Sequence, residues 1–273
     1  MVQKNILATI LINNFNNQKF LEKCINSCLT QSYKHLEIII YDDKSDDGSY
    51  KILKKIKDKR VKKIFNKRKK YKSSALNQFD AIRKSFLKAR GEIIFLLDGD
   101  DFFFKNKVKI ILNEFKKNKN LNFVQDNPIY FYPNNNQKLK KRLKEKYFVM
   151  HTWPYFNPTS TMVFRKSLLK KIIKDISFSY NSYEKMFFDA RAYIYIHFFE
   201  NNYKNLDKEL TLYTQNVKGD TLSNYDQKNI IWWQRRLQYH QFVKKLFYKK
   251  RKFHFKFLDY YLTLIVNFFG KFN

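Results

Sequence analysis

Short, mainly apolar runs alternate with longer amphipathic stretches over the first hundred residues. The runs at 6–12, 36–41, 61–65 and 92–97 predict strands, because short continuous apolar runs are typical of a buried parallel sheet. Between them, apolar residues recur at helical spacing. Strand and helix in this order predict the α/β class, with a mostly parallel central sheet flanked by helices.

Two of the expected helices carry features that bear on the environment of the protein. Cys24 and Cys28 both lie on the apolar stripe of the first helix, and the third helix covers about 74–89 with Gly91 placed to end it. The two cysteines have no zinc or disulfide spacing. They are therefore interpreted as small core residues of a protein in a reducing compartment.

The second half of the chain is less regular. Helices are expected at 106–117 and 183–198, strands at 121–125 and 161–164, and polar loops at 133–146 and 214–224. From Trp232 onward the chain is helical in period, aromatic and basic. These patterns predict a domain over 1–231, with halves 1–115 and 116–231, and a helical tail at 232–273.

Composition narrows the class of partner. The 273 residues include 55 Lys+Arg and 24 Asp+Glu, and the net charge of +31 indicates an anionic partner, either nucleic acid, a membrane surface or a phosphorylated substrate. AT-rich coding would also raise the lysine content, so charge does not choose among the three. With only 5 Gly, the chain has no glycine-rich dinucleotide or P-loop motif. No apolar stretch has the length of a membrane span or the form of a signal peptide.

Carboxylates follow two of the predicted strands directly. Asp42 and Asp43 come after the second strand, and a cluster of Asp98, Asp100 and Asp101 comes after the fourth. Ligands of open α/β sheets bind beyond the carboxyl ends of the strands. Clustered carboxylates repel one another, and a hard divalent cation shared with substrate phosphates relieves the repulsion. The pattern favours a metal–diphosphate ligand, although the first cluster alone also fits a polar turn with a helix cap.

Four segments follow one another in a recognisable order. They are INNFNN (12–17), LTQSY (29–33), YDDKSDDGS (41–49) and ARGEIIFLLDGDD (89–101). Their order and spacing over residues 6–115 resemble family 2 glycosyltransferases, which have the GT-A nucleotide-binding fold. The chain departs from the family at its usual Pro-Thr-Tyr turn, which is Asn13-Asn14-Phe15 here.

The resemblance implies a role for each matching residue. Asp43 would hydrogen-bond the nucleotide base, usually uracil, and Asn13 and Phe15 would contact or stack on it. Asp98 would lie near the ribose and the phosphates. Asp100 would bind a divalent metal, Mg²⁺ or Mn²⁺, which assists departure of the nucleoside diphosphate.

The catalytic base is expected in the second half, which resembles the family less closely. The segment FFDARAYIYI (187–196) is similar to the family segment that carries the base, so Asp189 is the candidate and Glu184 the rival. The resemblance implies inverting transfer of a sugar from a nucleotide-sugar donor, expected to be UDP-linked, to a glycan or lipid-linked acceptor. Cell-surface polysaccharide synthesis is the expected setting.

The sequence leaves the class of activity open to alternatives. A nucleic-acid-binding protein, a sugar nucleotidyltransferase and an inactive relative of the glycosyltransferases remain possible. An acidic cluster at a strand end repels phosphates unless a metal intervenes, so no nucleic acid is expected as a partner. The glycine-rich loop of the nucleotidyltransferases is missing.

The basic tail leaves the location open as well. Residues 232–273 carry ten Lys+Arg and one Asp, interleaved with aromatic residues. This composition fits a helix lying on an anionic membrane surface, and it also fits packing on the domain. The first interpretation predicts a cytoplasmic enzyme held peripherally on the inner face of a membrane.

Overall fold

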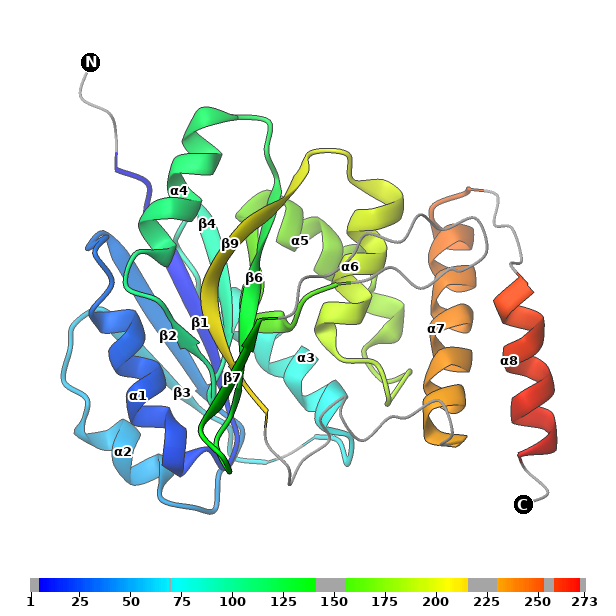
Figure 1. The fold of residues 1–273 in the computed structure, drawn as a ribbon, viewed down its shortest axis with the longest axis horizontal. Helices are drawn as coiled ribbons and strands as arrows, with labels where there is room; N and C mark the ends of the chain where they lie inside the picture. Colours follow the sequence, from blue (N-terminus) through cyan, green and yellow to red (C-terminus); the bar gives the residue numbers. More distant parts are fainter. Residues whose placement is uncertain (1–4, 69, 141–155, 216–229, 253–257, 271–273) are drawn as a thin grey trace.

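A single sheet with helices on both faces forms the body of the protein (Figure 1). The computed structural model describes residues 5–68, 70–140, 156–215, 230–252 and 258–270. The strands are β1 (Ala8–Asn14), β2 (Leu36–Asp42), β3 (Val61–Phe65), β4 (Ile93–Asp98), β5 (Phe102–Phe103), β6 (Phe123–Tyr132), β7 (Gln137–Lys140), β8 (Met162–Arg165) and β9 (Tyr203–Thr214). The helices are α1 (Gln18–Leu29), α2 (Ser49–Lys55), α3 (Ser74–Phe86), α4 (Lys107–Lys117), the short η1 (Thr159–Thr161), α5 (Lys166–Asp175), the short η2 (Ser177–Ser179), α6 (Phe188–Phe199), α7 (Ile230–Lys249) and α8 (Leu258–Phe269).

The first four strands form a parallel unit with β1 near its centre. The order across the sheet is β3-β2-β1-β4-β8-β6-β9-β5, and β7 pairs with β6. The register places Asn13 opposite Asp98 and Asn14 opposite Asp42, so three parallel strands end at one edge. Beyond β4, the antiparallel β8 joins this unit to the strands of the second half. The predicted α/β fold is confirmed.

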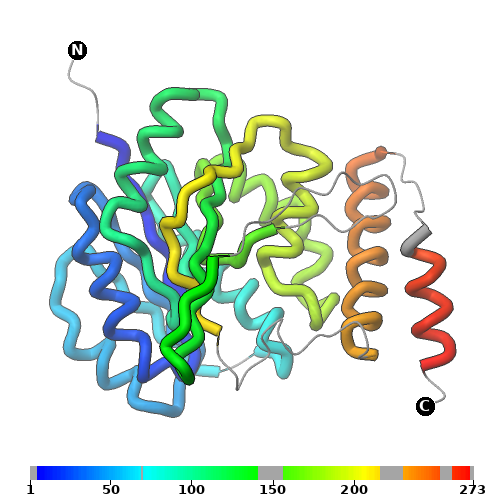
Figure 2. The backbone as a smooth tube through the Cα atoms, viewed as in Figure 1, coloured from blue at the N-terminus to red at the C-terminus, as the bar shows by residue number. Residues whose placement is uncertain are grey.

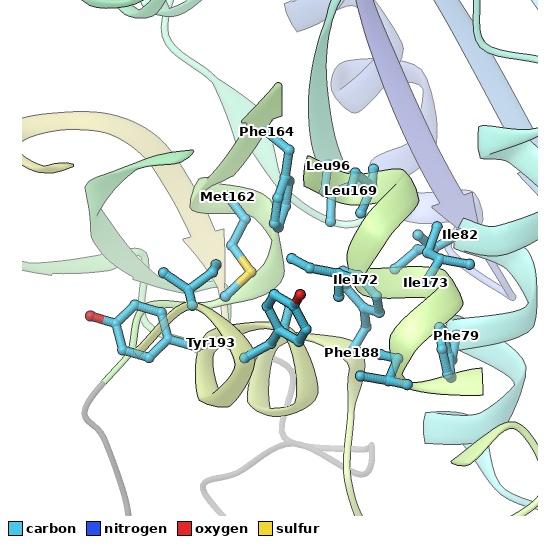
Figure 3. Packing of buried hydrophobic residues seen from close by; sticks show 14 of the residues in the cluster. Phe79, Ile82, Leu96, Met162, Phe164, Leu169, Ile172, Ile173, Phe188 and Tyr193 are labelled. Carbon is cyan, nitrogen blue, oxygen red and sulfur yellow. The ribbon is translucent and has the colours of Figure 1, made fainter. Parts of the chain in front are cut away.

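Two apolar layers attach the helices to the sheet. On one face, β1, β2 and β4 pack against α1, α2 and α4, and Cys24 and Cys28 are buried there as predicted. On the other face, α3, α5 and α6 pack against β4 and β8. Figure 3 shows this second layer, in which Phe79 of α3, Phe164 of β8 and Phe188 of α6 come together.

Helix α7 belongs to the second layer, whereas α8 lies outside it. Tyr239, Phe242, Val243 and Leu246 of α7 are fully buried in the layer. Helix α8 packs on the outer side of α7, away from the sheet (Figure 2). No helix among the described residues combines the length and the apolar character needed to cross a membrane. The helical prediction for the tail is confirmed, and the boundary between domain and tail stays a prediction.

Gly91 does not end a helix as predicted. Helix α3 ends at Phe86, and Gly91 instead begins the approach of β4 to β1. Its N–H donates to Thr9 Oγ1 at 2.9 Å, and a Cβ added there would lie 2.7 Å from the backbone nitrogen of Thr9. Glycine is required because the two backbones come this close.

The helix predicted at 183–198 begins five residues later, at Phe188. The cause is the fully buried guanidinium of Arg191. It donates to carbonyl oxygens of the preceding loop at 2.7–3.0 Å, namely those of Ser179, Ser182, Tyr183 and Met186. These carbonyls satisfy the buried cation, so the loop that carries them is not helical.

Helix α5 and strand β9 of the second half were not predicted, and the loop predicted at 133–146 contains a strand. Strand β7 lies inside the polar stretch 133–146 and is exposed at all four positions, so its sequence resembles a loop. Residues 141–146 of that stretch and 216–224 of the other predicted loop lie outside the described residues.

A buried ion pair connects α4 to the strands of the second half. Lys107 Nζ of α4 donates to Asp126 Oδ1 of β6 at 2.6 Å, to Thr211 Oγ1 of β9 at 2.6 Å and to the carbonyl of Ser160 at 2.8 Å. Both charged side chains are fully buried. Burial alone would lower the pKa of Lys107 and raise that of Asp126, and each charge opposes the shift of the other.

Replacing Lys107 with Met should lower the free energy of unfolding by about 3–5 kcal/mol, because Asp126 would remain as an uncompensated buried charge. The control is Lys117→Ala, which removes a 75% exposed partner of Glu114 and should cost less than about 1 kcal/mol. Urea denaturation of both variants measures the difference. Equal losses would mean that the buried pair contributes no more than a surface pair.

Candidate functional site

Polar side chains from three neighbouring strands meet at the carboxyl edge of the sheet. Asn13 is the second-last residue of β1, Asp43 follows β2 and Asp98 ends β4. Asn13 and Asp43 are buried, and Asp98 is half-buried. Phe15, directly after β1, is 41% exposed, so its ring has a face open to a ligand. The four residues predicted to contact a nucleotide are thus brought to the same edge.

The acidic turn after β2 is mostly structural. Asp42 accepts from Asn14 Nδ2 at 2.7 Å and from Ser45 Oγ at 2.6 Å, and Asp47 Oδ2 accepts from the N–H of Gln18 at 2.8 Å. These bonds hold the turn against the end of β1. For these two aspartates, the polar-turn interpretation is therefore correct.

Asp43 occupies a different position within the same turn. Its N–H donates to the carbonyl of Asn14 at 2.8 Å, and its Oδ1 accepts from Asn66 Nδ2 at 2.7 Å. Asn66 follows β3 directly, so two strand ends fix the orientation of the Asp43 carboxylate. A fixed acceptor at this edge is suited to the N–H groups of a nucleotide base.

Asp101, the last residue of the DGDD segment, serves the architecture. It is fully buried, and its carboxylate accepts from Ser160 Oγ and, at 2.7 Å, from the N–H of Thr214. Thr214 Oγ1 also donates to the carbonyl of Asp100. Asp101 therefore fixes the DGDD segment to η1 and to the end of β9, and it leaves Asp98 and Asp100 half-buried at the edge.

The Asp98 carboxylate has few groups to stabilise its charge. Gln78 Nε2 of α3 donates to its two oxygens at 3.1 and 3.2 Å. Desolvation and the neighbouring Asp100 carboxylate raise the pKa of Asp98 to about 7, and Asp189 adds to the shift. Gln78 also accepts from the N–H of Phe188, the neighbour of Asp189, so Asp98 and Asp189 belong to one site although they are 91 residues apart in the chain.

Asp189 stands in the first turn of α6, at the same site. Its neighbour Phe188 is fully buried, with its ring 5.5 Å from that of Phe79, which fixes the start of the helix. Burial raises the pKa of Asp189, while the cation of Arg235 on α7 acts to lower it. Glu184, the rival, is exposed, and only its backbone carbonyl has a described hydrogen bond, from Ser73 Oγ at 2.6 Å. Of the two candidates, Asp189 is the buried one, and the choice of base stays a prediction.

Several residues at the site were not identified from the sequence. Gln78 contacts Asp98 and also accepts from the N–H of Phe188 at 3.2 Å, so it connects two carboxylate-bearing segments. Tyr213, next to Thr214, is half-buried, and burial and the surrounding carboxylates raise its pKa well above the ordinary value. Arg235 of α7 lies close enough for its positive charge to lower the pKa of Asp189. The sequence signal that could have marked Gln78 and Arg235 is a polar residue among the apolar residues of a predicted helix.

The donor set is suited to a cation that a substrate also binds. Among the described residues, no group of three or more His, Cys, Asp and Glu side chains is arranged to hold a metal ion. Crowded carboxylates with raised pKa values nevertheless indicate an excess of negative charge, which a divalent cation would relieve. Mg²⁺ commonly takes one or two carboxylates and completes its shell with phosphates and water. The half-buried Asp100 fits such a site.

Comparison with known proteins agrees with the family resemblance found in the sequence. The family model described as Glycosyl transferase family 2 matches residues 9–190. The UDP-Glc:alpha-D-GlcNAc-diphosphoundecaprenol beta-1,3-glucosyltransferase WfaP from Escherichia coli is 36% identical over 102 residues, which cover 37% of this chain and 38% of WfaP. The chain spans about half the length, or less, of the curated relatives that it matches.

Two solved structures share the fold at low sequence identity. S. aureus TarS 1–349 in complex with UDP-GlcNAc has a TM-score of 0.64 at 15% identity, covering 96% of this chain and 70% of that one. The mannosyltransferase PcManGT from Pyrobaculum calidifontis, in complex with GDP-Man and Mn2+, has a TM-score of 0.55 at 11% identity, covering 89% and 65%. The GT-A expectation for the fold is confirmed.

Gly99→Ala should destabilise the edge of the sheet. The new Cβ would lie 2.7 Å from Asn14 Oδ1 and 3.1 Å from the carbonyl of Asn13, and overpacking of this kind costs about 1–3 kcal/mol. Gly48→Ala is the control, because its Cβ would meet only the flexible side chain of Gln18. Thermal unfolding should show the lower Tm for Gly99→Ala. A larger loss for Gly48→Ala would contradict the steric argument.

Proposed function

The chain belongs to glycosyl transferase family 2, and we propose that it transfers a sugar from a nucleotide-sugar donor to an acceptor hydroxyl with inversion at the sugar carbon. The observation that carries the proposal is that Gln78 joins Asp98, with Asp100 two residues further on, to the start of α6, which carries Asp189. Two of these carboxylates come from a strand end and the third from a distant helix. This arrangement supplies a phosphate-side and an acceptor-side carboxylate at one site.

We propose a UDP-linked donor held along the edge of the parallel strands. Asp43, fixed by Asn66, would accept from the base, and Asn13 and Phe15 would contact its face. Asp98 would accept from the ribose hydroxyls near the phosphates. The similarity to WfaP, whose name specifies UDP-Glc, and the fold shared with TarS, solved with UDP-GlcNAc, support UDP as the nucleotide.

We propose that Asp100 holds a divalent cation, Mg²⁺ or Mn²⁺, together with the donor diphosphate. When bound, the cation would neutralise the charge that develops on the departing diphosphate. Asp101 would contribute by position, since its bonds to Ser160 and Thr214 fix the backbone that carries Asp100. The Mn2+ complex of PcManGT supports a metal in this fold.

Asp189 would act as the general base. Its carboxylate accepts the proton of the acceptor hydroxyl while that oxygen bonds to the anomeric carbon and the bond to the diphosphate oxygen breaks. Burial raises its pKa, which makes it a stronger base than an exposed aspartate, and the cation of Arg235 opposes that shift. Attack from the face opposite the leaving group inverts the configuration.

We propose a glycan or lipid-linked acceptor in cell-surface polysaccharide synthesis, at the inner face of a membrane. The support comes from the relatives, since the name of WfaP specifies a diphosphoundecaprenol-linked substrate. Membrane attachment would bring the site to such an acceptor.

Asp100→Asn should reduce transfer by about 10³-fold or more, because it removes the charge that holds the cation. Release of nucleoside diphosphate from UDP-sugars and GDP-sugars with Mn²⁺ measures the activity. Glu22→Gln, an exposed carboxylate of α1, is the matched control and should retain full activity. Wild-type activity that is undiminished in EDTA would exclude metal dependence.

Asp189→Asn should lower kcat by about 10²–10⁴ and leave donor affinity nearly unchanged, because the base acts on the acceptor alone. Glu184→Gln is the matched variant, five residues earlier and exposed, and should behave as wild type. Steady-state kinetics and donor titration separate the two effects. If Glu184→Gln carries the loss instead, the base is Glu184.

A further inference from the structure

Helix α8 turns its apolar side chains away from the protein. Six of them are 39–64% exposed and form what we call the α8 apolar face, made of Tyr261, Leu262, Leu264, Ile265, Phe268 and Phe269. Their spacing of one, three and four residues makes a continuous stripe along the helix. Helices of water-soluble proteins place such a stripe toward the core, so the polarity of α8 is reversed.

The opposite face of α8 is polar and is held against α7. Thr263 is fully buried and Asn267 is 7% exposed. Asn267 Nδ2 donates to the carbonyl of Trp233 on α7 at 3.0 Å, and the Tyr260 ring lies 5.4 Å from the buried ring of His240. These contacts fix the rotation of α8 about its axis. The outward direction of the apolar face is therefore a property of the packing.

We propose that the α8 apolar face binds an anionic lipid surface, with the helix lying in the plane of the interface. The twelve residues of α8 are too few to cross a bilayer. Residues 230–252, which lead to α8, carry eight Lys+Arg and no Asp or Glu. An apolar stripe next to a cationic segment supplies both contributions that stable interfacial binding requires.

Charge also distinguishes lipid from a second copy of the chain. A twofold contact through the α8 apolar face would bring the same basic segment near its own copy. With a net charge of +31, two copies of the protein repel each other, whereas an anionic bilayer attracts each copy. The charge that opposes one occupant therefore favours the other.

Cosedimentation of the full-length chain with lipid vesicles tests the proposal. The wild type should bind phosphatidylglycerol vesicles at low salt, bind phosphatidylcholine vesicles weakly and lose affinity as salt rises. The double variant Ile265→Glu/Phe268→Glu should lose at least about tenfold in partitioning. Leu87→Glu, at a 70% exposed position after α3, is the matched control and should bind as wild type.

Several outcomes would overturn the proposal. The proposal is wrong if the wild-type protein stays in the supernatant with phosphatidylglycerol vesicles at low salt. It is also wrong if the double variant binds these vesicles as well as the wild type does. A wild-type dimer in size-exclusion chromatography that the double variant abolishes would assign the face to a second copy. Vesicle binding needs no turnover, so Asp100→Asn should bind as wild type, which separates this proposal from the proposed function.

Discussion

Repulsion between buried carboxylates is the constraint on which the site depends. Asp101 and Asp189 are buried, Asp98 and Asp100 are half-buried beside them, and the pKa of each of Asp98, Asp101 and Asp189 is raised. Such a cluster persists only where hydrogen-bond donors surround it and where a cation can join it. The donors come from α3, η1 and the end of β9, so the cluster draws distant segments together.

The two halves of the chain have different tasks in this arrangement. In the parallel unit β1 to β4, the continuous apolar runs form buried strands. The carboxyl ends of these strands carry the polar residues of the site. The elements of the second half are instead fixed by buried cations: Lys107 of α4 with Asp126 holds η1 and β9, and Arg191 with preceding carbonyls holds the start of α6. Lys107 is satisfied by oxygens from elements far apart in sequence, and Arg191 by carbonyls 5–12 residues before it, so both buried cations favour one packing.

The two C-terminal helices differ in how they bury their apolar side chains. Helix α7 completes the core with Tyr239 and Phe242, and Arg235 reaches Asp189. Helix α8 adds no apolar face to that core and presents one outward. Helix α7 therefore connects the core to the outermost helix of the described chain.

The sequence alone determined the parallel half and the positions of the polar residues at its strand ends. Apolar runs and helical periods are local signals, and they located β1 to β4 within two residues, along with the strand ends that carry Asn13, Asp43, Asp98 and Asp100. The segment around Asp189 was found by its similarity to the family.

Only the tertiary structure separated the acidic residues with structural hydrogen bonds from the candidate site residues. Asp42 and Asp101 look like Asp43 and Asp100 in sequence, but their hydrogen bonds to Ser45, Ser160 and Thr214 make them structural. Strand β9 and the true start of α6 were missed because they depend on pairing with β6 and on the buried Arg191. Those contacts join residues far apart in the chain, or bury a charge against neutral carbonyls, and no local pattern of apolar and polar residues records either.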